Sequence, residues 1–86
     1  MIETRERETG WGRGDAAAER ARILPRLVPV EPEDLADLGR GGRARVLRLL
    51  ARALRGERAR GRDGHWSYSL DRHVALVGAL AAERRA

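Results

Sequence analysis

The chain of 86 residues contains no cysteine, no phenylalanine and no lysine, and its aromatic side chains are two tryptophans and one tyrosine. Without cysteine, a disulfide framework and a cysteine-based zinc site are both excluded. No run of about 18 apolar residues is present, so the sequence predicts no membrane span. The charged residues 1–8 do not resemble a secretory signal. We therefore expect a cytoplasmic protein with no metal, no cofactor and no membrane contact.

Aliphatic residues are also scarce. Leu, Val and Ile total 18 residues, about 21% of the chain, which is close to the composition at which chains stop folding alone. All of them except Ile2 lie between Ile23 and Leu80, so the core must come from this part of the chain. Residues 1–14 are rich in glycine and mixed charges, and we expect a flexible N-terminal tail there. Residues 15–86 are then predicted to form a single small domain.

The pattern of caps and breakers predicts an all-α fold. The expected helices cover residues 16–24, 32–38, 43–60 and 70–85. Asp15 is a suitable cap for the first helix and Pro25 a stop, residues 39–42 are a glycine-rich turn, and Ser67 or Ser69 is a cap for the last helix. The two longer helices, joined by about ten residues, should form an antiparallel hairpin covered by the shorter helices.

The net charge of +5 is unevenly distributed. Residues 1–39 carry a net charge of −3, residues 40–62 a net charge of +8, and the remainder is neutral. Every basic residue is an arginine, and the planar guanidinium group suits phosphates and carboxylates. Because codon usage in a GC-rich genome also explains missing lysine, its absence alone says little about function.

Helical periodicity divides the predicted helix at residues 43–60 into two faces. At 100° per residue one face is aliphatic and the other basic, which is typical of a half-buried helix. The basic side chains are Arg45, Arg48, Arg52 and Arg55. With the arginines that follow, they form a row about 15–20 Å long that can meet the phosphates of a nucleic acid strand. The row can equally be a solvated face neutralised by upstream acids, which are Glu31, Glu33, Asp34 and Asp37.

These observations favour a small arginine-rich nucleic-acid-binding adaptor, of the regulatory or phage-packaging kind, that contacts phosphates non-specifically. Base-specific reading is less expected because asparagine and glutamine are absent. Residues 32–38, 39–42 and 43–60 also have the approximate lengths of a helix-turn-helix. The main alternative is an accessory or adaptor subunit of a bacterial protein complex, whose basic face meets an acidic protein and no nucleic acid.

The predicted helix at residues 70–85 is apolar nearly all round, which is typical of a helix buried on several sides. One row contains larger aliphatic side chains, and a neighbouring row contains small ones that allow a second helix to approach closely. We expect a homo-oligomer or a docked complex through this helix. The predicted interface residues are Val74, Val77, Gly78, Ala81 and Ala82.

Catalytic patterns are missing, and we expect no enzymatic activity. The sequence contains no phosphate-binding loop, and the two serines before the last helix fit helix caps. His65 and His73 lie near Trp66 and Tyr68, but their spacing matches no metal site. We expect His73 to bond a backbone carbonyl at the edge of the core, and both aromatic side chains to close the open end of the hairpin.

The C-terminal part carries the pattern Tyr-Ser-Leu-Asp-Arg-His-Val at residues 68–74, followed by Ala-Leu and Ala-Glu pairs. It resembles the C-terminal part of small uncharacterised alphaproteobacterial proteins that have a Tyr-Ser-x-x-Arg-His-Val helix start. The resemblance covers residues 58–85 and leaves out the N-terminal half. It implies a bacterial, cytosolic, helical protein and carries over no activity. Tyr68 and Arg72 are one turn apart and are expected to bond each other or the preceding loop.

Overall fold

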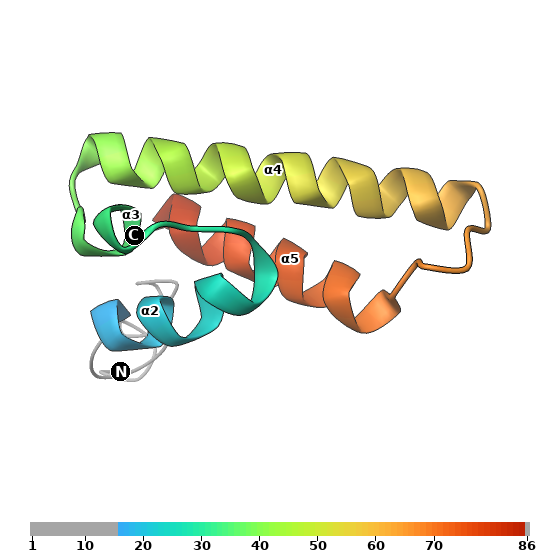
Figure 1. Ribbon diagram of the computed structural model, residues 1–86, viewed down its shortest axis with the longest axis horizontal. Helices are drawn as coiled ribbons and strands as arrows, with labels where there is room; N and C mark the ends of the chain where they lie inside the picture. The colour runs from blue at the N-terminus through green and yellow to red at the C-terminus, as the bar shows by residue number, and fades with distance from the viewer. Residues whose placement is uncertain (1–15, 86) are drawn as a thin grey trace.

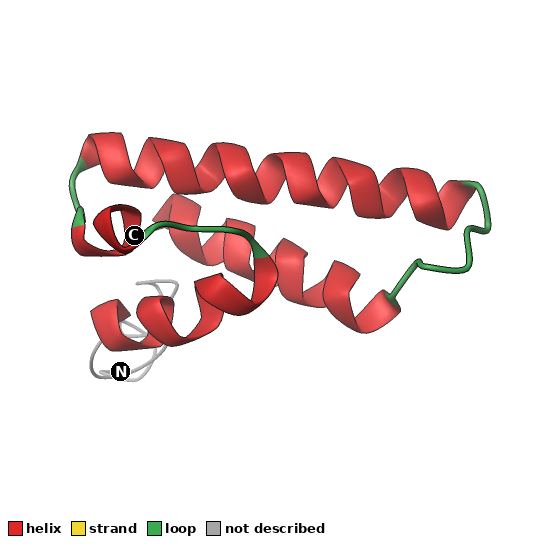
Figure 2. Cartoon of the chain, viewed as in Figure 1, coloured by secondary structure: helices red, strands yellow, loops and turns green. Residues whose placement is uncertain are grey.

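A computed structural model describes residues 16–85, which form four helices and no strand (Figure 1). The helices are α2 (Ala16–Leu27), α3 (Pro32–Ala36), α4 (Arg40–Arg62) and α5 (Leu70–Arg85). The all-α fold is therefore confirmed for these residues, and Figure 2 shows only short loops between the helices. The tail expected at residues 1–14 lies outside the described part of the chain.

The two long helices α4 and α5 run in opposite directions beside each other, while α2 packs on α5 and α3 on the start of α4 (Figure 1). The core lies where α2, α4 and α5 face one another. The buried apolar residues are Leu24, Val28, Val46, Leu50, Leu54, Leu76, Ala79, Leu80 and Ala82. None of the four described helices is long and apolar enough to cross a membrane.

Helix α2 continues through Pro25, which was expected to end it. A proline in the last turn leaves one backbone hydrogen bond unmade, yet the helix extends to Leu27 and the N–H of Val28 donates to Leu24 O at 3.0 Å. Arg20, Leu24 and Val28 recur every four residues and are all buried. Packing of this buried side thus outweighs the missing hydrogen bond.

Helix α3 is shorter than predicted and ends at Ala36. Pro32 fits its first turn because a proline has no N–H to leave unpaired there. The Asp34 carboxylate accepts the backbone N–H of Glu31 at 3.2 Å. This bond fixes the start of α3 and holds the Asp34 side chain beside α4.

Helix α4 is longer than predicted at both ends. Residues 40–42, expected as a turn, form its first turn, and the N–H of Arg43 donates to Gly39 O at 3.1 Å. A side chain at Gly42 would collide with the carbonyl oxygen of Asp37, so this position requires glycine. After α4 ends, Gly64 adopts a φ of +63°, a left-handed conformation that turns the chain toward α5.

Helix α5 has the predicted bounds. Ser69 is its cap, since its hydroxyl accepts the N–H of Arg72 at 3.1 Å. Among the described residues of one chain, this helix is buried on one side, and burial of its other sides by a partner stays a prediction. Leu76 and Leu80 enter the core, whereas Leu70 and Val74 are exposed, because the short helices α2 and α3 leave one side of α5 uncovered.

Candidate functional site

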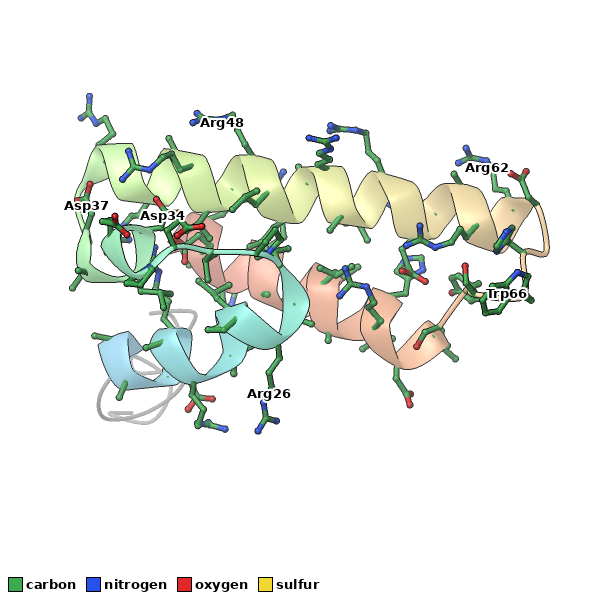
Figure 3. All side chains as sticks on the ribbon, in the orientation of Figure 1. Arg26, Asp34, Asp37, Arg48, Arg62 and Trp66 are labelled. Carbon is green, nitrogen blue, oxygen red and sulfur yellow. The ribbon has the colours of Figure 1, made fainter. Side chains whose placement is uncertain are left out.

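The candidate site is the basic face of α4, defined as Arg45, Arg48, Arg52 and Arg55. All four side chains are exposed. Figure 3 shows Arg48 on the side of α4 turned away from α5, with Arg62 further along the same side. The aliphatic side of α4 supplies Val46, Leu50 and Leu54 to the core. The two-faced helix expected from the sequence is therefore present, and core packing is what turns the arginines outward.

The four arginines line one shallow groove of about 600 Å³ beside α4. The other lining residues are Pro29, Asp34, Leu49 and Ala51. Pro29 belongs to the connector between α2 and α3, so the extended connector forms one wall of the groove and α4 the other. An elongated ligand with several negative charges can contact all four guanidinium groups from this side.

Arg45 is occupied by carboxylates of the same chain. Its Nε donates to Asp34 Oδ1 at 2.6 Å, and its Nη2 donates to Asp37 Oδ2 at 3.4 Å. The hydrogen bond from Arg45 is the main cause that lowers the pKa of Asp34, and the backbone N–H of Glu31 adds to it. The same bond raises the pKa of Arg45. Two upstream acids thus neutralise the α3 end of the basic face.

The other three arginines are different. Within residues 16–85, the side chains of Arg48, Arg52 and Arg55 make no hydrogen bond or ion pair. The remaining upstream acids, Glu31 and Glu33, are exposed and form no ion pair with the basic face. The sequence left open whether the face is paired or bare. Among residues 16–85 it is paired at one end by Asp34 and Asp37, and the other three arginines have no side-chain partner.

The arginines beyond the basic face divide in the same way. Arg58 and Arg62 are exposed and continue the basic side toward the end of α4. Arg60 is turned toward the core instead, where its Nη2 donates to Glu57 Oε1 at 2.6 Å. The usable row therefore extends past Arg55 through two further arginines.

A buried acid, Glu57, joins α4 to α5, and the sequence interpretation did not identify it. Its Oε2 accepts the N–H of Ser69 at 2.8 Å, and Arg72 Nε lies 3.4 Å from Oε1. The hydrogen bond from Arg60 is the main cause that lowers the pKa of Glu57, followed by the Ser69 N–H. One signal was present in the sequence, because Glu57 is the single acid within residues 40–62.

A second buried pair joins α2 to α5. Arg20 Nε donates to Glu83 Oε1 at 2.9 Å, and Arg20 Nη2 donates to Glu83 Oε2 at 2.9 Å. A third donor, Arg20 Nη1, reaches Leu35 O at 3.1 Å. Every buried side-chain nitrogen and oxygen in the described residues has a partner. These buried charges hold helices together and do not line the groove.

The aromatic cluster near the last loop differs from expectation. The Tyr68 hydroxyl lies 3.0 Å from His73 Nδ1, so the expected backbone carbonyl partner of His73 is wrong. The Tyr68 ring packs over Gly61, and this contact brings its hydroxyl to His73. Trp66 is almost fully exposed and does not close the hairpin. Residues 16–85 contain no group of three or more His, Cys, Asp or Glu side chains that could hold a metal ion.

The bond expected between Tyr68 and Arg72, or from either side chain to the preceding loop, is also absent among the described residues. Arg72 Nη1 instead donates to Leu27 O at 2.8 Å, which ties the start of α5 to the end of α2. Among the predicted interface residues, Val74, Val77, Gly78 and Ala81 are exposed on α5. Ala82 is buried in the core of its own chain, because it faces the other helices. It is therefore not available to a partner.

No protein-family profile, curated protein or solved structure matches this chain. The resemblance of residues 58–85 to small alphaproteobacterial proteins therefore stays a prediction.

Proposed function

We propose that this protein is a small nucleic-acid-binding adaptor, of the regulatory or phage-packaging type, that holds phosphates non-specifically on the basic face of α4. One observation carries the proposal: Arg48, Arg52 and Arg55 are exposed along one side of a helix and make no ion pair within the described residues. Unpaired guanidinium groups on a line are suited to a chain of phosphates, whose counterions they release. The proposal assigns no catalytic step to the protein.

The dimensions of the face fit this role. Arg48 and Arg55 are separated by about 10 Å along the helix axis, at 1.5 Å per residue. That distance corresponds to roughly three base-pair steps of a duplex. Arg58 and Arg62 lengthen the contact, while Arg45 is held back by Asp34 and Asp37. We therefore expect about three phosphate contacts from the basic face of each chain.

Binding of a random 30-base-pair duplex tests the proposal. The three phosphate contacts of the basic face contribute about −2.7 to the slope of log K against log salt, and contacts from Arg58 and Arg62 make the total slope steeper. The affinity should then fall at least about 40-fold between 50 and 200 mM salt. Fluorescence anisotropy with a labelled duplex measures both quantities, and a shuffled duplex sequence should bind equally well.

A matched pair of triple variants locates the contact. Replacing Arg48, Arg52 and Arg55 by glutamine should flatten the salt slope by about 2.7, because the three unpaired guanidinium groups are removed, and only the part due to Arg58 and Arg62 should remain. The control replaces Arg22, Arg26 and Arg40, which are exposed arginines outside the basic face and outside α5, so that the net charge changes equally. Equal loss of duplex binding in the two triple variants would show that only net charge matters, and the proposal would be wrong.

The acidic protein partner stays a second candidate because Arg45 already binds carboxylates. The bonds from Arg45 to Asp34 and Asp37 show that a carboxylate fits this end of the groove. In this case an acidic peptide of at least ten glutamates should compete for the groove, and the duplex should not bind at 50 mM salt. If the acidic peptide and the duplex both bind, and replacing Arg52 weakens the two affinities equally, the nucleic-acid function still stands.

A further inference from the structure

Four of the five large apolar side chains that are exposed in the described residues lie on α5 or just before it, and the fifth, Leu38, precedes α4. The exposed fractions of the four are 89% for Trp66, 64% for Leu70, 62% for Val74 and 43% for Val77. Leu70, Val74, Val77 and the exposed Ala81 follow one another at steps of four, three and four residues. This spacing is the heptad pattern of a helix that packs along a second helix. We call these four residues the apolar row.

The surroundings of the apolar row leave room for a second helix. A methyl group built at Gly78 would meet no atom within 4 Å. Small residues beside a row of larger ones let two helix axes approach closely. The row is therefore an open surface, and no described residue of the same chain covers it.

The charges at the two ends of α5 indicate which partner fits. Asp71 lies in the first turn, and Arg84 and Arg85 lie in the last turn. A second α5 in the opposite direction brings Asp71 of each copy toward the two arginines of the other. The helix dipoles then also oppose each other. A parallel pair would instead place like charges together at both ends.

We propose that two copies of this chain pair through their α5 helices, antiparallel and related by a two-fold axis. Such an interface is self-complementary, because every contact between two different positions occurs twice, once on each side of the axis. The Leu70 end of one row then lies at the Ala81 end of the other, so that large side chains meet small ones. Trp66 lies beyond this end and is placed to cover it.

The contact is small, and this sets the expected affinity. A helix of 16 residues is about 24 Å long, and two such helices bury less than the roughly 1,200 Å² of a standard interface. We expect a dissociation constant on the order of 10 µM. The core-facing side of α4 carries Val46, Leu50 and Leu54, and Figure 3 shows Arg48 on the side turned away from α5, so the exposed basic face stays open in the pair. Pairing therefore does not depend on the proposed nucleic-acid function.

Sedimentation of the full chain between 5 and 500 µM, without nucleic acid, tests the pairing. The wild type should change from monomer to dimer with concentration. Val77→Glu should raise the dissociation constant about tenfold or more, since it places two like charges in the apolar row. Ala75→Glu, an exposed position outside the row, is the control and should behave like the wild type. Circular dichroism checks that both variants keep their helix content.

Exchanging the end charges tests the antiparallel direction. Asp71→Arg alone, and Arg84→Asp together with Arg85→Asp, should each weaken the dimer roughly fivefold. The variant that combines all three changes should restore the wild-type affinity, because opposite charges meet again at both ends. A monomer at every concentration, an equal effect of Val77→Glu and Ala75→Glu, or a combined variant no better than its parents would each overturn the proposal.

Discussion

Arginine has two distinct roles in this small protein. Arg20 is buried, and its guanidinium group donates to the Glu83 carboxylate and to the Leu35 carbonyl. Arg48, Arg52 and Arg55 are exposed and have no such partner among residues 16–85. A guanidinium group can leave water only when its donors are satisfied. The comparison teaches that location and pairing, more than composition, separate structural arginines from those open to a ligand.

Removing either partner of the buried Arg20–Glu83 pair is expected to have the largest effect on stability. Arg20→Ala or Glu83→Ala should lower the free energy of unfolding by about 3–5 kcal/mol, because each leaves a buried charge without its partner. A domain of this size has a total stability of roughly 5 kcal/mol or less, so either variant should be largely unfolded at 25 °C. Urea denaturation followed by circular dichroism measures the change.

The control for that experiment is Arg22→Ala on the same helix. Arg22 pairs with Glu19 on the surface, and exposed pairs contribute at most about 1 kcal/mol. If the Arg20 and Arg22 variants lose the same stability, the distinction between buried and exposed arginines fails.

Acidification should act on the buried carboxylate of Glu57. The pKa of Glu57 is lowered by Arg60 and by the Ser69 N–H. A carboxyl whose folded pKa is depressed stabilises the fold fully above its ordinary pKa of 4.5, and this contribution is lost as the pH falls below it. Stability measured at pH 7, 5, 4 and 3 should therefore decline over the last two steps.

Glu57→Gln sharpens the same measurement. The variant should be less stable than the wild type at pH 7, and its stability should fall less between pH 5 and 3, because the titrating group is gone. Glu33→Gln, an exposed acid on α3, should keep the wild-type pH dependence. Parallel pH curves for the wild type and Glu57→Gln would rule out the role given to this carboxylate.

The smallest expected effect concerns the paired end of the basic face. Asp34→Asn removes the main partner of Arg45, which should add one phosphate contact and steepen the salt slope by about 0.9. The duplex affinity should rise several-fold at 50 mM salt. Glu33→Gln removes the same charge one residue away and should change the slope little. A slope unchanged by Asp34→Asn would mean that Arg45 does not reach the ligand.

The sequence predicted the parts of this fold that depend on local patterns. The bounds of α5 and the two faces of α4 follow from caps and from helical periodicity. Pro25 shows the limit, because burial of Leu24 and Val28 carried α2 past a residue that normally ends helices. The first turn of α4 was missed because glycine at position 42 indicates a turn in the sequence pattern. It is instead required by the close approach of Asp37, a tertiary contact.

The site was predictable in its position and unpredictable in its pairing. Periodicity placed Arg45 and Arg52 on one face, as found. Which upstream acids reach that face depends on how the chain returns through α3, and only Asp34 and Asp37 do so. The Arg20–Glu83 pair joins positions 63 residues apart, and no local pattern reports such a contact.

The most direct test of the central claim is an NMR titration of the wild-type protein with a 30-base-pair duplex at 50 mM salt, following the arginine Nε–Hε signals. The account predicts that the signals of Arg48, Arg52 and Arg55 shift or broaden together, while the signal of the buried Arg20 stays in place. Shifts spread evenly over all exposed arginines, or no shift in α4, would contradict it.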